Sequence, residues 1–262
     1  MTNPRRLIFT VATMILMTFL AAPGARAMSG REVYEKVHEL RTRMLDQKSE
    51  ATMVLYDRSG SKRTRTLTEY SKNAAPEAYK VLLVFNSPAD LKGVGFLAHA
   101  RTFADRNLWA YFPEYKRIRR IPTSAQDDSF FGSDFTYDDF SGPPNMDDYS
   151  FKMLREENFD ERPCYVVEVT PKIPRKYTRY VAWIAKNLWI ITKIEYYRDK
   201  DLYRAGTGRN IRTIDGLPTP FYLEMENLKT KHKTVLTVNS MVYKTKFPDE
   251  LFTQRALERG GR

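Results

Sequence analysis

The chain has 262 residues, a net charge of +11, three histidines and one cysteine. This length suits one domain or two small ones and is sufficient to bury a hydrophobic core. A single cysteine excludes an intramolecular disulfide, and the strand-like run around Cys164 favours a small buried hydrophobe over a reactive thiol.

The N-terminus has the pattern of a cleavable secretory signal. Arg5 and Arg6 precede a mainly apolar run over 7–20, and a small-x-small site ends at Ala27. The run is short for a membrane span of about 20 residues, although an uncleaved anchor is the alternative. We therefore predict cleavage after Ala27, which leaves residues 28–262 as an exported, soluble single domain.

Loss of the signal removes three arginines and lowers the net charge from +11 to +8. A basic surface usually suggests nucleic acid, but export removes nucleic acid as a routine ligand. Anionic lipid head groups, an acidic protein partner or simple solubility are the remaining explanations. Transient contact with a membrane is compatible with the first of these.

The mature chain opens with one clear helix and continues mainly as strands. Ser29 and Glu32 have the spacing of a capping box, and apolar residues at 33, 37, 40 and 44 share one helical face. Strand-like segments with short connections occupy 52–121 and 150–244. They predict a strongly curved antiparallel sheet of about ten strands with the helix on its concave side, and 248–252 predicts a short helical cap.

Residues 123–148, here called the acidic segment, contain seven aspartates, no basic residue and several aromatic rings. We expect short helical turns that pack these rings, since aromatic content argues against disorder. The aspartates would cap these turns or face the basic hairpin formed by Lys116, Arg117, Arg119 and Arg120. Calcium binding by Asp134, Asp138 and Asp139 is less favoured, because their spacing does not match a calcium loop.

The sequence contains no recognisable catalytic pattern. His38, His99 and His232 are far apart and lack metal-ligand spacing, and neither a nucleophile elbow nor a nucleotide-binding loop is present. Paired carboxylates for sugar hydrolysis need a separation that sequence does not show. We therefore expect a binding protein without a cofactor or a metal, not an enzyme.

Apolar strand surface is abundant and indicates either core packing or a groove for acyl chains. Burial of each methylene is worth about 0.8 kcal/mol, so a long chain can bind without polar chemistry. The candidates for lining such a groove are Val81, Leu83, Phe85, Phe96, Leu108, Phe112, Phe221, Leu223 and Met225.

Three segments carry a resemblance to a known family. They read LKGVGFL at 91–97, LWAYFP at 108–113 followed by RIRRI at 117–121, and FGSDFTYDDF at 131–140. With the layout of 29–255, they resemble the outer-membrane lipoprotein-sorting family, larger relatives of the periplasmic carrier LolA. The resemblance implies a LolA-like half-barrel, a mainly β (α+β) fold in which helices cover the concave face of a curved antiparallel sheet.

The resemblance also implies a function. The first hypothesis is a periplasmic carrier that binds lipid, or the acyl chains of lipoproteins, for transport towards the outer membrane. The alternative is a periplasmic accessory or sensor protein of an inner-membrane RND-type exporter that acts through protein contacts. For such contacts the charged candidates are Lys116, Arg117, Arg119 and Arg120 on the hairpin, with Asp134, Asp138 and Asp139 in the acidic segment.

Overall fold

The computed structural model describes residues 27–75, 78–102 and 105–261. The predicted signal therefore lies outside the described residues, apart from Ala27. The first element is helix α1 (Gly30–Arg43), whose N-cap Ser29 forms the predicted capping box with Glu32. Within the described ranges, no helix is long and apolar enough to cross a membrane.

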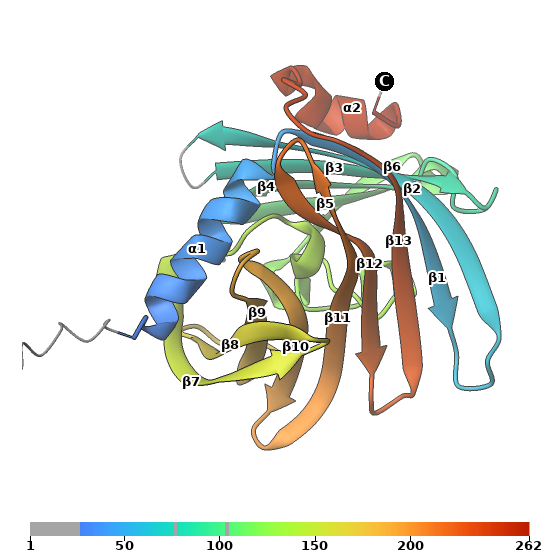
Figure 1. The fold of residues 1–262 in the computed structure, drawn as a ribbon. Helices are drawn as coiled ribbons and strands as arrows, with labels where there is room; N and C mark the ends of the chain where they lie inside the picture. Colours follow the sequence, from blue (N-terminus) through green and yellow to red (C-terminus); the bar gives the residue numbers. More distant parts are fainter. Residues whose placement is uncertain (1–26, 76–77, 103–104, 262) are drawn as a thin grey trace, which may run out of the picture.

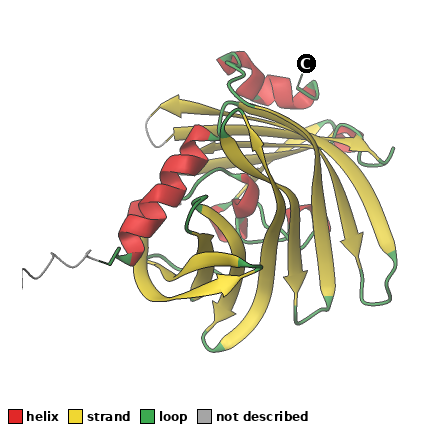
Figure 2. Cartoon of the chain, in the orientation of Figure 1, coloured by secondary structure: helices red, strands yellow, loops and turns green. Residues whose placement is uncertain are grey.

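Within the described residues, thirteen strands form one antiparallel sheet. The sheet is strongly curved (Figures 1 and 2). The strand order is β6-β5-β4-β3-β2-β1-β13-β12-β11-β10-β9-β8-β7, so β6 and β7 are the two edges and the sheet stays open. The strands are β1 (Gln47–Tyr56), β2 (Lys62–Ala75), β3 (Ala78–Ser87), β4 (Gly95–Ala100), β5 (Arg106–Phe112), β6 (Arg117–Ile121), β7 (Tyr149–Phe159), β8 (Arg162–Pro171), β9 (Arg179–Ala185), β10 (Ile190–Arg198), β11 (Asp201–Ile214), β12 (Leu217–Asn227) and β13 (His232–Val242).

Strand β3 contributes side chains to both faces of the sheet, because successive side chains of a strand point to opposite sides. Val81, Leu83 and Phe85 belong to the main core on the concave face. Leu82 and Val84 belong to a second core on the convex face, under the short elements η6 (Asp249–Phe252) and α2 (Gln254–Glu258). The C-terminal cap therefore covers the side of the sheet opposite to α1.

The concave face is covered by α1 and by the acidic segment. Tyr34 of α1 packs on Phe151 at 4.8 Å between ring centroids, and its hydroxyl bonds that of Tyr180 at 2.7 Å. The acidic segment forms the expected short turns, which are four 3-10 helices. These are η2 (Thr123–Ala125), η3 (Phe130–Gly132), η4 (Asp138–Phe140) and η5 (Met146–Asp148).

The structure confirms the predicted half-barrel and the early helix on its concave side. The estimate of about ten strands was too low, since the described part of the chain contains thirteen. The first strand also begins earlier than predicted, since β1 starts at Gln47 and not at residue 52. Four of the five added residues are polar, and a search for apolar strand residues does not detect them.

Candidate functional site

The concave face retains an apolar hollow beside the C-terminal end of α1. This first hollow has a volume of about 250 Å³ and lies between α1, the turn after η4, and strands β1, β2, β12 and β13. Val81, Leu67 and Ala51 come from one side of the sheet, and Leu223 and Leu236 from the other. Small-molecule sites are typically lined in this way by apolar side chains with few polar groups.

A second hollow of about 210 Å³ continues from the first towards β10 and β11. Gly206 and Gly208 of β11 face it, and a Cβ at Gly206 would lie 2.8 Å from the methyl of Met225. The two hollows share five lining residues and together form what we call the concave groove. The shared residues are Arg41, Asp139, Phe140, Leu223 and Leu236.

The predicted groove residues divide into two groups. Val81, Leu223 and Met225 line the concave groove. The others line neither hollow: Leu83, Phe85, Phe96 and Leu108 are fully buried core residues, Phe112 is partly buried against the same core, and Phe221 is buried under the guanidinium of Arg212.

Aromatic rings of the acidic segment occupy the concave face above β3 and β4. Phe130 is fully buried, and its ring centroid lies 5.4 Å from Phe96, 4.8 Å from Phe131 and 4.3 Å from Phe140. Phe131 adopts a left-handed backbone (φ 48°), and its carbonyl accepts a 2.7 Å hydrogen bond from Arg65. The acidic segment therefore fills part of the sheet's apolar face and leaves the concave groove beside it.

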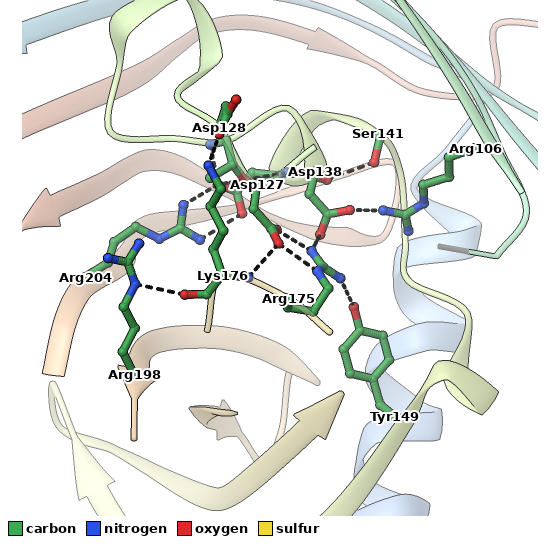
Figure 3. Close-up of polar contacts among 12 residues, drawn as sticks. Arg106, Asp127, Asp128, Asp138, Ser141, Tyr149, Arg175, Lys176, Arg198 and Arg204 are labelled. Carbon is green, nitrogen blue, oxygen red and sulfur yellow. Dashed lines mark hydrogen bonds and ion pairs between the residues drawn. The ribbon is translucent and has the colours of Figure 1, made fainter. Parts of the chain in front are cut away.

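Buried arginines outside the acidic segment form ion pairs with its aspartates (Figure 3). Arg175 is 1% exposed and donates to Asp127 at 2.6 Å, to Asp138 at 2.7 Å and to the hydroxyl of Tyr149 at 2.7 Å. Arg106 also pairs with Asp138. Each carboxylate is thus compensated by a cation that is itself withdrawn from water.

The ion pairs determine the protonation of these groups. Burial alone would raise the pKa of Asp127, but hydrogen bonds from Arg175 outweigh it, and the pKa lies below its usual value. Burial would lower the pKa of Arg175, but Asp127 and the neighbouring tyrosines reverse this, and the pKa lies above its usual value. Both groups are therefore charged across the ordinary pH range.

The expected meeting of the aspartates with the basic hairpin was wrong for the three candidates. Asp138 pairs with Arg106 and Arg175, while Asp139 pairs with Arg204 at 3.0 Å. Asp139 also accepts a hydrogen bond from the backbone N–H of Thr136, but no side chain caps η4. Asp134 accepts a 2.7 Å hydrogen bond from the hydroxyl of Thr234. Internal partners thus occupy these carboxylates, because burial demands compensation that a surface hairpin cannot supply.

The basic hairpin lies at the β6 edge and is largely exposed. Lys116 lies in the turn of the hairpin with a left-handed backbone. Arg117, Arg119 and Arg120 are exposed on the edge strand. Arg119 lies over the ring of Phe112 at 6.0 Å, and Arg120 donates to Asn107 at 2.7 Å. Charged side chains on an edge strand discourage pairing with another chain.

Sequence reasoning missed the cations at this site. Arg106, Arg175 and Arg204 lie in strand or loop contexts where a charge usually indicates solvent exposure. Arg41 was also missed, since it comes directly after Leu40, the last buried residue of α1. The one available signal was the excess of aspartates in the acidic segment, which requires cations from elsewhere in the fold.

The lining of the concave groove suits an apolar ligand, and none of the three histidines is part of it. Across the described parts of the chain, no three His, Cys, Asp or Glu side chains are grouped to hold a metal ion. His99 lies on the convex face, where its Nε2 donates to the Phe252 carbonyl at 2.7 Å. The concave groove itself presents an apolar wall with a few charged side chains.

Comparisons with known proteins agree with this geometry. A family model described only as "uncharacterized protein" matches residues 77–259. This chain belongs to that family. None of the curated proteins matches the sequence.

Solved structures identify the fold. A protein described as an outer membrane lipoprotein-sorting protein domain from Vibrio parahaemolyticus is 27% identical with a TM-score of 0.83, over 88% of this chain and 98% of that one. A DUF1329 family protein from Desulfovibrio piger is 29% identical with a TM-score of 0.82, over 87% and 97%. A LolA superfamily protein from Nitrosomonas europaea shares the fold at 21% identity and a TM-score of 0.71, over 88% and 100%. The resemblance to the lipoprotein-sorting family is confirmed.

Proposed function

We propose that this protein is a periplasmic carrier that binds acyl chains of a lipid or a lipoprotein in the concave groove, for transport towards the outer membrane. The observation that carries the proposal is the apolar wall of this groove, where Leu223, Leu236 and Phe140 join the two hollows. The name of the Vibrio parahaemolyticus protein supports a lipid-linked cargo. Residues 28–262 would form the single exported domain, without a catalytic role or a cofactor.

The energetics favour a long chain. Each buried methylene contributes about 0.8 kcal/mol. Association costs roughly 4–15 kcal/mol in lost freedom, so about ten methylenes are needed before binding becomes useful. Each hollow alone is smaller than the roughly 300–1,000 Å³ of ordinary ligand sites, and only their union reaches this range.

Native mass spectrometry of the mature protein, released gently from its own periplasm, tests the proposal together with lipid extraction. A defined added mass that extracts as a lipid or an acylated peptide is the expected result. A clean mass of the unliganded chain, unchanged after incubation with membranes, would refute the carrier function.

A matched pair of variants tests the location. Leu223→Trp fills the junction of the two hollows, whereas Tyr222→Trp places the same indole on the opposite face of β12. We expect Leu223→Trp to abolish uptake of a fluorescent long-chain fatty acid and Tyr222→Trp to leave it intact. Equal uptake by both variants would place the ligand elsewhere.

The accessory or sensor alternative rests on the exposed basic hairpin alone, since Asp138 and Asp139 are occupied inside the fold. It predicts that neutralising Arg117, Arg119 and Arg120 abolishes capture of an inner-membrane exporter while lipid binding persists. Unchanged capture would remove this alternative.

A further inference from the structure

The charged side chains that line the concave groove are nearly all compensated within the protein. Five charged residues line its two hollows, and four of them have a partner of their own. The pairs are Asp139 with Arg204 at 3.0 Å, Lys193 with Glu195 at 2.7 Å, Glu224 with Lys233 at 3.4 Å and Glu69 with the Gln47 amide at 3.2 Å.

Arg41 is the exception. It lies in the last turn of α1, is half-buried and lines both hollows of the concave groove. It also lines a third, smaller hollow of about 90 Å³ surrounded by tyrosines, among them Tyr34 and Tyr180. Within the described residues, no carboxylate pairs with Arg41 and no group accepts a hydrogen bond from its guanidinium.

The acids that share hollows with Arg41 do not cancel its charge. Asp138 pairs with Arg106 and Arg175, and Glu224 pairs with Lys233. The hydrogen bonds and ion pair from Arg204 already engage Asp139. Burial raises the pKa of Glu69, and the Gln47 amide donates a hydrogen bond to one of its carboxylate oxygens. An arginine that meets three hollows is therefore available to a ligand and is not committed to the fold.

We propose that Arg41 binds the acidic group, a carboxylate or a phosphate, of an amphiphile whose acyl chain lies in the concave groove. This rests on the proposed function and narrows its cargo to acidic lipids. A guanidinium presents paired N–H donors that match a carboxylate or a phosphate, and such charge-assisted bonds are stronger than neutral ones. The hydrocarbon would follow the wall formed by Leu223 and Leu236 away from α1.

The test compares three ligands with the same sixteen-carbon chain: palmitate, hexadecyl phosphate and hexadecanol. Titration of the mature protein at neutral pH should show the two acids binding at least roughly tenfold tighter than the alcohol. Arg41→Gln should reduce both acids to the affinity of the alcohol. Arg43→Gln is the matched control, since Arg43 lies in the same turn but is exposed and lines neither hollow.

Each outcome separates the possibilities. Loss of preference for only one acid in Arg41→Gln would identify whether a carboxylate or a phosphate is the natural group. Equal binding of acids and alcohol by the unaltered protein would overturn the role of Arg41 while the carrier function stands, and this comparison does not depend on the variant's folding. Binding of none of the three would overturn both proposals.

Discussion

Replacement of Arg175 by methionine should destabilise the fold through the aspartates that it leaves behind. Arg175 is 1% exposed, and its partners Asp127 and Asp138 are 9% and 18% exposed. Breaking a buried pair by removing one partner costs about 3–5 kcal/mol, because the remaining charge is poorly solvated. Arg106 still compensates Asp138, so the uncompensated charge is mainly that of Asp127, and the lower end of this range is expected.

Lys176→Met is the matched control for this prediction. Lys176 is the next residue along the chain and pairs with Asp128, but both side chains are 45% exposed. Exposed pairs contribute roughly 0–1 kcal/mol, so the control should be close to the unaltered protein. The assay is urea unfolding followed by circular dichroism, with the unfolding free energy as the readout. Losses of equal size in the two variants would refute the reasoning that burial makes the Arg175 pairs structurally important.

Three further changes test other parts of the structure. Phe130→Ala should cost about 3–5 kcal/mol of unfolding free energy, since the ring is fully buried among Phe96, Phe131 and Phe140; a loss below 1 kcal/mol by urea unfolding would show that the acidic segment does not pack as described. Ser29→Ala should cost about 1 kcal/mol through loss of the α1 cap, read as a small fall in melting temperature, and no fall would contradict a role for the capping box. The folded-state pKa of Asp127 lies below the unfolded value of about 3.9, so the stabilisation by its carboxylate is present above that pH and is lost as the pH falls through the folded value. Asp127→Asn should therefore flatten the plot of unfolding free energy against pH between 5 and 2. Parallel plots for the variant and the unaltered protein would contradict this role of Asp127.

The sequence predicted those features of the fold that depend on local patterns. The capping box at Ser29 and the apolar spacing from Val33 identified α1, and the aromatic content of the acidic segment indicated packed turns. Val81, Leu83 and Phe85 were predicted as apolar strand surface, and the structure places them in the main core of the concave face. In each case the signal lies within a few residues of the element it predicts.

The candidate site could be predicted only in part, because it depends on residues that the fold brings together from distant positions. Val81, Leu223 and Met225 line the concave groove, yet Leu83 and Phe85 have the same apolar character and lie in the core beneath the acidic segment. The two groups differ in whether the acidic segment packs over them, and the spacing of residues in the sequence does not reveal this. The arginine partners of the aspartates were hidden for the same reason, since Asp138 and Arg175 are far apart in the chain.

The acidic segment links the stability of this protein to the shape of its groove. Asp139 and Phe140 are adjacent residues of η4: the first is paired with Arg204, and the second forms part of the wall that joins the two hollows. The same buried ion pairs that attach the segment therefore fix the position of the groove's wall. Since Arg41 faces this wall from α1, an acidic ligand would lie between a fixed apolar surface and a cation that the fold leaves available.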